Sequence, residues 1–447
     1  MKFNNILTLL IFNTIILISC FSTKNKSTKN PIQTENIFSK KEPLEYPEKV
    51  SYKNKIFNDN IKTVLCLKNN QDISVAIINL ESNEKIILSF DDLDADVKDY
   101  YYTIIHCNAD WTASNLIETE YIDGFTEEAI NDYEFSFNTI QKYTHYQFEF
   151  PSQNIKPRIS GNYIFKIYEK NSDTIIYKRF MVLDNKIHIN ADVKRATLAK
   201  DRKIKHEVDF ILKHPNLVVM DPFSDIKVHI KQNNKDDNAI KNLLPQFVRN
   251  GELIYDYDEE NTFPGNNEFR HFEFKSLRYK SDRIKTIEYD SIYNNIYLFD
   301  DKKRSYESYS IIPDINGNFI IKSQEGWKSS VEADYAFVHF SLPIDKISYG
   351  NLFLLGNFSD WQLKEEFKLK YNQNQKKYEG KIYLKQGYYN YHYALEDTIS
   401  KNIDISFIEG THYQTANDYY LYVYYRSVGD RYDRLLGFLK TSSKELY

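Results

Sequence analysis

Residues Tyr100 to Trp111 read YYYTIIHCNADW, a stretch that begins with aromatic and β-branched side chains. Such side chains fit the pleated, half-buried surface of a sheet, so the stretch is predicted to be a β-strand. Successive side chains of a strand point to opposite faces. His106 and Asp110 are therefore expected on one face, and Cys107 and Trp111 on the other.

Comparable runs recur along the chain, with turn residues between them. They include SVAIINL, KIILSF, HYQFEF, NYIFKIYE and IIYKRFMVL, then KIHINADV, HEVDFIL, DIKVHIKQ and NFIIKS, and finally ADYAFVHFSL, NLFLLGNF, KKYEGKIYL and YYLYVYYR. With 37 Tyr and 29 Phe among 447 residues, the composition also favours strands. Many short strands without long helical periodicity predict an all-β fold of sandwich domains. The segment from Thr126 to Thr139 interrupts this rhythm and is predicted to be a crossover loop with a helical turn.

The length of the chain is enough for roughly three domains of ordinary size. Its apolar fraction of 42% allows each domain a sizeable core. The predicted parts are a signal peptide at 1–19, a flexible tether at 20–50, three consecutive β-sandwiches at 51–185, 186–331 and 332–437, and a tail at 438–447.

The N-terminus is typical of a secreted lipoprotein. Lys2 precedes a mostly apolar run from Ile6 to Ile18, which is too short to span a bilayer. The run closes with LISC, which resembles a bacterial lipobox whose cysteine, Cys20, receives the lipid. The alternative is an ordinary signal peptide with an incidental cysteine. The following residues to Val50 are rich in Lys, Asn, Ser, Thr and Pro, which is typical of a tether.

The charge of the chain gives no reason to expect a nucleic acid partner. The formal net charge is −5, which is small for this length. Nucleic-acid-binding domains usually carry a strong basic excess instead.

Two cysteines, Cys66 and Cys107, remain after the predicted lipobox. A secreted protein occupies a compartment where disulfides can form. The two residues are therefore a candidate disulfide, and two free thiols are the alternative.

The group His106, Cys107, Asp110 and Trp111 could form a metal site, a thiol nucleophile with its base, or part of a core. A regular strand points His106 and Cys107 apart, so they cannot grip one zinc ion or act as a dyad. We expect Cys107 and Trp111 in the core, and His106 with Asp110 as a structural hydrogen-bonded pair. A partner surface and a catalytic group are the weaker alternatives. Other motifs for hydrolase, protease or phosphate chemistry are missing from the sequence.

A run of carboxylates lies just upstream, at Asp91, Asp92, Asp94 and Asp96. Such runs usually mark solvated turns. Calcium is an alternative, but the spacing lacks the glycine and the distal glutamate of an EF-hand loop. We therefore expect no metal and no cofactor.

Two later stretches, NLFLLGNFSDW and KQGYYNYHYAL, resemble the early-set immunoglobulin-like domains that include glycogen-binding modules. Gly356, Phe358 and Trp361 match the turn of these domains, and Tyr391 and Tyr393 match a later strand. The resemblance implies that Trp361 could stack on a sugar. However, the sequence has no later tryptophan, and His392 stands near the position of the expected lysine. Trp361 is therefore expected to serve packing, and glycan is not expected as the main partner.

The whole chain is similar to the plug proteins of the type IX secretion system of Bacteroidetes. The segments that carry the resemblance are FDDLDADVKDYYYTIIHCNADWTASNLIETEYIDGF (90–125), YTHYQFEFP (143–151), SGNY (160–163), FPGNNEFRHFEF (263–274), LKQGYYNYHY (384–393) and TANDYYLYVYYRSVGDRYDRLLG (415–437). They cover residues 55 to 437 in the order of the family.

This resemblance implies a non-enzymatic subunit that blocks the periplasmic side of an outer-membrane barrel, the type IX translocon. The lipid would tether the protein to the outer membrane. The residues after Cys20, FSTKN, lack the acidic cluster that resembles a surface-export tag, which favours the inner leaflet.

The segment YYLYVYYRSVGDRYDR is the candidate contact with the barrel, because Tyr and Arg often carry interface energy. Its candidate contact residues are Arg426, Arg431, Tyr432 and Arg434. The alternative for this segment is an edge strand followed by a solvated turn. The alternative function is a periplasmic or surface lipoprotein that binds glycan through its C-terminal domain, and an enzyme is the third hypothesis.

Overall fold

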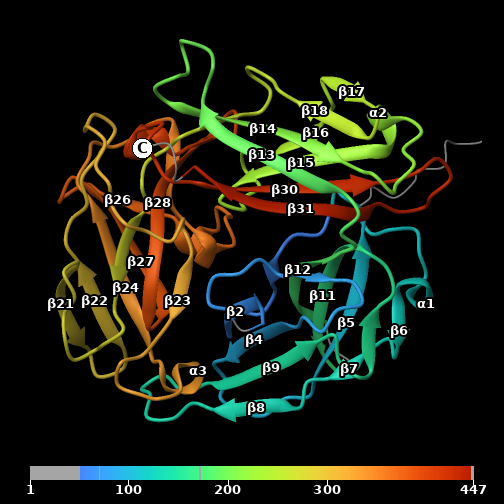
Figure 1. The fold of residues 1–447 in the computed structure, drawn as a ribbon. Coiled ribbons are helices and arrows are strands. Elements are labelled where there is room, and N and C mark those ends of the chain that lie inside the picture. The colour runs from blue at the N-terminus through green and yellow to red at the C-terminus, as the bar shows by residue number, and fades with distance from the viewer. Residues whose placement is uncertain (1–50, 70, 171–172, 444–447) are drawn as a thin grey trace, which may run out of the picture. The chain divides into compact units, whose positions relative to one another are not determined.

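The computed structural model describes residues 51–69, 71–170 and 173–443. The predicted signal peptide, the tether and Cys20 lie outside these residues. The described chain is all-β, as predicted, with antiparallel pairing predominant and a few short helices (Figure 1). No helix in the described ranges is long and apolar enough to cross a membrane.

The first sandwich is formed by two sheets that enclose one apolar core. One sheet has the order β1 (Lys55–Ile56), β12 (Thr174–Leu183), β11 (Gly161–Glu169), β5 (Tyr100–Cys107) and β7 (Glu128–Ala129), and β3 (Ile77–Asn79) joins β12. The other has the order β2 (Ile61–Lys68), β4 (Ile86–Asp92), β9 (Thr144–Phe150) and β8 (Asp132–Phe135). The helix α1 (Glu118–Tyr121) and the pair β6 (Ile122–Gly124) and β10 (Ile155–Pro157) complete this part. The predicted crossover loop at 126–139 therefore contains two short strands, β7 and β8, and no helix.

The middle sandwich combines segments from two distant parts of the sequence. One sheet has the order β13 (His188–Arg195), β14 (Lys205–Lys213), β18 (Glu252–Tyr255) and β17 (Phe247–Arg249), and β19 (Thr262–Pro264) also pairs with β14. The facing sheet has the order β16 (Ile240–Leu243), β15 (Ile226–Gln232), β30 (Asp418–Tyr425) and β31 (Arg434–Ser442). The helix α2 (Pro222–Asp225) leads into β15.

The third sandwich lies between these two segments in sequence. Its long strand β28 (Gly387–Asp397) pairs with β20 (Arg270–Glu273), β23 (Phe319–Ile321), β25 (Gly350–Leu355) and β29 (Ile403–Asp404). The facing sheet has the order β21 (Ile284–Tyr289), β22 (Asn294–Leu298), β24 (Tyr335–Leu342), β27 (Lys377–Lys385) and β26 (Lys370–Asn372). Short helical turns are α3 (Ser329–Glu332), η1 (Asn357–Ser359), η2 (Glu365–Phe367) and α4 (Ser406–Glu409).

The sheets therefore do not follow the predicted boundaries at 186–331, 332–437 and 438–447. The strands from β20 to β24 contribute to the third sandwich although most of them lie within 186–331. The strands β30 and β31 belong to the middle sandwich, and β31 continues to Ser442 inside the predicted tail. The physical reason is that β15 needs a partner on its second edge. The strand β30 supplies it from about 190 to 200 residues later in the chain, in a register that runs from Gln232 with Tyr419 to Ile226 with Tyr425.

Every residue of β30 is buried, so this strand is covered on both faces. Tyr419, Leu421 and Val423 pack in the core of the middle sandwich. The alternate residues Tyr420 and Tyr422 pack against the first sandwich, in a separate cluster. Because β31 pairs with the other edge of β30, the strand is interior and not the edge strand considered above. In Figure 1 these two strands, in red, lie between β15 and the first sandwich.

The Leu421→Ala substitution tests the place of β30 in the middle core. Leu421 is completely buried between β15 and β31. We expect the free energy of unfolding to fall by about 2–5 kcal/mol, because the change leaves a cavity in the core. Urea unfolding measures this loss. Val428→Ala, in the exposed turn after β30, is the matched control and should change it by less than about 0.5 kcal/mol. Equal effects of the two substitutions would contradict the assignment.

Candidate functional site: the three domain junctions

The strand β5 directs His106 and Cys107 to opposite sides, as its alternation predicts. His106 lies in the first sandwich, where its ring contacts Tyr163 edge to face at 4.9 Å. Cys107 lies in the apolar cluster between the first and middle sandwiches. Burial is the largest cause that lowers the pKa of His106 to about 4, so this imidazole is neutral near pH 7. The two side chains therefore do not form a dyad or share a metal.

Asp110 and Trp111 depart from the predicted strand, because β5 ends at Cys107 and a tight turn follows. Trp111 has a φ of +64°, and this left-handed conformation turns the chain back on itself. The carboxylate of Asp110 is exposed and accepts hydrogen bonds from the backbone N–H and hydroxyl of Thr112, at 2.9 and 2.7 Å. The predicted His106–Asp110 pair is therefore wrong. The predicted core position is correct for Trp111, which packs with Cys107 and lies under Arg179.

Cys66 and Cys107 are both buried free thiols and not the candidate disulfide. Cys66 packs in the core of the first sandwich, whereas Cys107 packs in the cluster at the junction with the middle sandwich. Burial raises the pKa of each thiol to about 12, so neither is a thiolate near neutral pH.

The junction between the first and middle sandwiches is organised by the buried carboxylate of Asp433. One of its oxygens accepts the backbone N–H of Ala109 at 2.9 Å. The other pairs with Lys227 of β15 and with Arg426, each at 2.8 Å. Arg426 also donates to the Asn108 side chain at 2.5 Å. The carboxylate thus joins the turn after β5 to two parts of the middle sandwich.

The SGNY segment takes part in the same junction. The Asn162 side chain donates to the Asn108 carbonyl at 3.0 Å and accepts from the Tyr424 hydroxyl at 2.9 Å. Gly161 has a φ of +149°, and a Cβ there would lie 2.4 Å from Nε2 of His106. Only glycine allows this close approach. Three of the segments that resemble the family therefore meet at one place.

The four residues expected to contact a partner instead make contacts within this chain. Arg426 takes part in the Asp433 junction. Arg431 forms an ion pair with Glu120 of the first sandwich, and the ring of Tyr432 contacts His106 at 5.3 Å. Arg434 pairs with Asp430 and lies over the ring of Tyr425. This segment therefore joins the first sandwich to the middle one.

The junction between the first and third sandwiches contains a second buried carboxylate, Asp91. It contacts His145 of the first sandwich at 2.6 Å, and Tyr335 and Lys385 of the third at 2.6 and 2.5 Å. Burial alone raises the pKa of Asp91, but Lys385 and His145 outweigh it and lower the pKa below its ordinary value. The carboxylate is therefore charged, and it holds an ammonium group that is also fully buried.

The neighbouring carboxylates, considered above as a calcium site, surround a lysine. The ammonium group of Lys98 lies 2.8 Å from Asp92 and also contacts Asp94, while Asp96 is 3.7 Å away. A further group of carboxylates, Glu207, Asp209 and Asp256, lies within ligand distance of one another. Here too a lysine, Lys194, pairs with two of them. In both groups a side-chain cation of the protein stands where a metal ion would bind.

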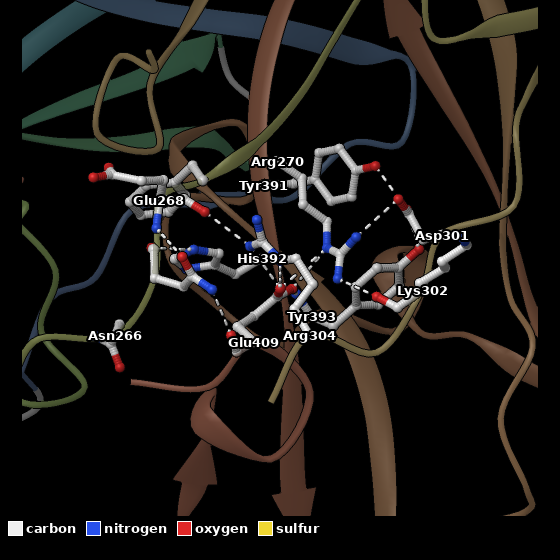
Figure 2. A network of polar contacts seen from close by, with 12 residues as sticks. Asn266, Glu268, Arg270, Asp301, Lys302, Arg304, Tyr391, His392, Tyr393 and Glu409 are labelled. Carbon is white, nitrogen blue, oxygen red and sulfur yellow. Dashed lines mark hydrogen bonds and ion pairs between the residues drawn. The ribbon is translucent and has the colours of Figure 1, made fainter. Parts of the chain in front are cut away.

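A third buried carboxylate, Glu409, lies at the end of α4, beside the linker that returns from the third sandwich to the middle one (Figure 2). Its cations, Arg270 and Arg304, also belong to the third sandwich. Arg270 donates to it at 3.0 Å and Arg304 at 2.9 Å, and the backbone N–H of Tyr393 donates at 3.0 Å. Arg270 also pairs with Asp301 at 3.0 Å. Burial raises the pKa of Glu409, but the two guanidinium groups outweigh it and lower the pKa to about 2.

This network holds the two linkers that cross between these sandwiches. The carbonyl of Glu409 accepts from the Asn267 side chain at 2.7 Å. Further along, the Asn417 side chain donates to the Gly265 carbonyl at 2.8 Å, and the Thr415 hydroxyl donates to the Asn266 carbonyl at 2.9 Å. The outgoing and returning linkers are thus bonded to each other.

Trp361 does not lie on an open surface of the third sandwich. Its half-buried ring contacts Phe269 edge to face, with ring centroids 5.9 Å apart, and packs against Gly317. The ring also lines a cavity of about 230 Å³ to which all three sandwiches contribute. His392 is buried, stacks on Phe269 at 3.8 Å, and has its pKa lowered to about 3, with burial as the main cause. Both side chains serve packing in this structure.

The sequence reasoning missed the role of all three carboxylates. Asp91 stood in a run that looked solvated, and Asp433 and Glu409 had no local motif around them. Each finds its cations more than 90 residues away, with the exception of Arg426 beside Asp433. The one signal available was that each carboxylate lies in or next to a segment that resembles the family.

These features define an all-β protein whose sandwiches are joined by buried polar contacts and apolar packing, and whose candidate reactive side chains are used in packing. The family model for the first domain of the type 9 secretion system plug protein matches residues 61–184. The crystal structure of a hypothetical protein from Parabacteroides merdae ATCC 43184 is 33% identical, with a TM-score of 0.86 over 88% of this chain and 100% of that chain. None of the curated proteins compared with the chain matches it significantly. The chain belongs to the type IX secretion system plug protein family.

The Glu409→Gln substitution tests the charge at the third junction. At pH 7 we expect it to lower the free energy of unfolding by about 3–5 kcal/mol, because it leaves two buried guanidinium groups without this countercharge. A carboxylate whose pKa is lowered on folding stabilises the fold fully above its unfolded pKa, here about 4.5, and loses this effect as the pH falls toward about 2. Urea unfolding should therefore show a constant difference between wild type and variant above pH 5 and a smaller one at pH 3. Glu365→Gln, at an exposed ion pair with Lys368, is the control and should have little effect.

The Asp433→Ala substitution should loosen the junction between the first and middle sandwiches. We expect faster reaction of the Cys107 thiol with a thiol reagent, in a chain that carries Cys20→Ser and Cys66→Ala. The rate should rise about tenfold for every 1.4 kcal/mol lost from the junction, and the loss of a buried charged acceptor costs about 1–3 kcal/mol or more. Asp430→Ala, in the exposed turn nearby, serves as the control. An unchanged rate in Asp433→Ala would contradict a role of this carboxylate in closing the junction.

Proposed function

We propose that the chain is a non-enzymatic subunit of the type IX secretion system that plugs the periplasmic side of the outer-membrane translocon by steric occlusion. The observation that carries the proposal is the match of residues 61–184 to the plug protein family model. The segment with the strongest resemblance lies within this match, and it supplies Asp91 and Ala109 to two of the three junctions.

The architecture suits a steric role on physical grounds. A plug acts through its shape, so its parts must keep their relative positions under load. Three sandwiches linked by simple tethers would move against each other, since small polar interfaces permit domain motion. Here the buried Asp91–Lys385 ion pair joins the first and third sandwiches, Asp433 and an apolar cluster join the first and middle ones, and linkers bonded to each other join the middle and third. These contacts support a rigid body that could fill an opening.

The state of the reactive side chains supports a role without catalysis. The thiols of Cys66 and Cys107 have their pKa raised to about 12 by burial, so they are poor nucleophiles at neutral pH. His106 is buried, and its Nε2 lies 3.4 Å from the Ser160 carbonyl. A general base must instead reach a substrate proton.

The proposed location is the periplasmic face of the outer membrane, with a lipid on Cys20 and the inner leaflet favoured. A flexible tether at 20–50 would allow the folded part to reach and leave the barrel while it stays at the membrane. The translocon barrel is the proposed partner.

Glycan binding through the third sandwich has less support. A sugar-binding platform requires an accessible aromatic face, whereas Trp361 is packed against Phe269 and Gly317. A glycan array with Trp361→Ala as the control would separate the two functions. Binding lost in the variant would favour the glycan alternative.

Co-purification tests the proposed function. A tagged full-length chain, extracted in mild detergent from cells that secrete by this system, should recover the translocon barrel. Cells without the chain should become more permeable to a large hydrophilic antibiotic, because an unplugged pore is open. A matched control is a tagged, unrelated outer-membrane lipoprotein expressed at the same level. Absence of the barrel from the wild-type sample would overturn the proposal.

A further inference from the structure

Five large apolar side chains project into solvent at one end of the middle sandwich. They are carried by the loop before α2, by α2 itself, by β17 and by the turn after β30, and they are Val218, Met220, Phe223, Phe247 and Val428. These five side chains, the apolar tips, are each more than half exposed, and Met220 and Val428 are 79% and 89% exposed. Several large apolar side chains gathered in solvent mark a surface that a protein or a membrane covers.

Hydrogen bonds hold together the segments that carry the apolar tips. The Tyr425 hydroxyl, at the end of β30, donates to the Val218 carbonyl at 3.2 Å. The next backbone N–H, that of Arg426, donates to the Asp225 carbonyl in α2 at 2.9 Å. The carbonyl of Gly251, in the hairpin from β17 to β18, accepts from the loop before α2 at 3.2 Å. The apolar tips therefore belong to one end of the sandwich, where Figure 1 shows α2 and β17.

The chain enters the folded part beside this end. Ser51, the first residue that the structure describes, donates from its hydroxyl to the Asp110 carbonyl at 2.8 Å, in the turn after β5. The same turn contacts the segment after β30, because Arg426 donates to the Asn108 side chain. Cys20, the predicted site of the lipid, lies about 30 positions before Ser51. A flexible tether of this length spans about 30 Å on average, so a lipid on Cys20 keeps a bilayer within reach of this end.

The arrangement of the apolar tips also favours a lipid surface. They stand on four different segments, so they form separate points and not one continuous face. A protein partner that buried them would need a rigid surface packed at the density of a protein interior. The fluid boundary between the headgroups and acyl chains of a bilayer fills the spaces between such points, and apolar side chains gain there by leaving water.

The charged groups at this end do not oppose contact with a bilayer, because the carboxylates are used within the chain. Asp221 accepts from the backbone of α2, and Asp225 accepts from the backbone of the residue before the helix, each at 3.1 Å. Glu252 pairs with a lysine of β14, and Asp430 with an arginine of β31. Arg249, at the end of β17, is exposed and forms no ion pair in the described part of the chain. Anionic headgroups attract such a basic residue.

We propose that the apolar tips insert into the surface of a lipid bilayer, so that this end of the middle sandwich faces the membrane. This inference rests on the proposed location at the outer membrane, and it adds the orientation of the folded part there. A tether alone leaves the folded part free to rotate. With the apolar tips inserted, one side of the protein faces the membrane, and a barrel opening in that membrane meets a defined side of the plug.

Fluorescent labels on the full-length chain, reconstituted into vesicles of phosphatidylethanolamine and phosphatidylglycerol, test the inference. Met220→Cys and Val428→Cys each receive an environment-sensitive fluorophore, while the buried thiols of Cys66 and Cys107 stay unlabelled. Lipids that carry a nitroxide quencher should quench both labels, because such a quencher acts only at short range. The emission of both labels should also shift to the blue, and a quencher dissolved in the water should lose access to them.

Tyr279→Cys is the matched control. This side chain is 77% exposed, close to the value for Met220, and it belongs with Trp327 to the exposed aromatic side chains in loops of the third sandwich. Its label should be quenched several times less by the same lipids. Equal quenching of the labels at positions 220, 428 and 279 would contradict the inference.

A double substitution, Met220→Ser with Phe223→Ser, tests whether the apolar side chains themselves hold this end at the membrane. The label at Val428→Cys should then lose roughly tenfold of its protection from the aqueous quencher, because burial of each side chain contributes to insertion. The melting temperature should stay the same, since both side chains are exposed. Tyr279→Ser with Trp327→Ser is the control pair and should leave the protection unchanged. Unchanged protection in the first pair would overturn the inference.

The outcomes separate this inference from the proposed function. Loss of aqueous access only after the purified translocon is added would assign this end to a protein partner and overturn the inference. Loss that depends on protein concentration without vesicles would assign it to a second copy, with the same consequence. If wild type recovers the translocon while the labels at 220 and 428 behave like the control, the inference is wrong and the proposed function stands. If mass spectrometry finds no lipid on Cys20 and the chain does not bind vesicles, the proposed location and the inference both fail.

Discussion

The return of the chain to the middle sandwich is the constraint on which the rest of the structure depends. The strand β30 pairs with β15, which lies about 190 residues earlier, and most of the strands of the third sandwich lie between the two in sequence. Because side chains alternate along a strand, the same eight residues serve two cores. Tyr419, Leu421 and Val423 fill the middle sandwich, while Tyr420, Tyr422 and Tyr424 cover the first. The strand β30 therefore belongs both to the core of the middle sandwich and to its contact with the first sandwich.

Like β30, the three buried carboxylates connect parts of the chain that are distant in sequence. A buried ion pair gains little net stability over apolar packing, because both charges lose their hydration. An unpaired buried charge is far more costly, so each carboxylate penalises any arrangement that separates it from its cations. Asp91 applies this penalty to the first and third sandwiches, because its cation Lys385 belongs to the third. Asp433 and Glu409 have their cations within the middle and the third sandwich, and Asp433 contacts the first sandwich through the backbone N–H of Ala109. Asp91 and Asp433 therefore favour one relative position of the sandwiches, whereas Glu409 holds the third sandwich beside the linker that contains Asn267.

The local pattern predicted the local structure well, and failed where distant segments meet. Alternation correctly placed His106 and Cys107 on opposite faces of β5, because both lie inside one regular strand. It failed for Asp110, since β5 ends at Cys107 and the chain turns back at Trp111 in a left-handed conformation, which no residue type in this stretch predicts. The predicted domain boundaries were wrong because the residues of a strand do not show which sheet that strand will join. The run YYLYVYYR did carry a usable signal: apolar and aromatic residues on both faces indicate a strand that is buried twice, and not an edge.

The same physics separates the two surfaces that were candidates for a partner. The Arg-rich turn after β30 has the composition of an interface, but Arg426, Arg431 and Tyr432 find their partners in the first sandwich of the same chain. Trp327 and Tyr279 have the same kind of composition, but their side chains are exposed to solvent. Composition alone cannot distinguish these cases, because an interface inside one chain and an interface between chains use the same residues. The contacts made within the chain distinguish them, since the turn after β30 already has its partners in the first sandwich.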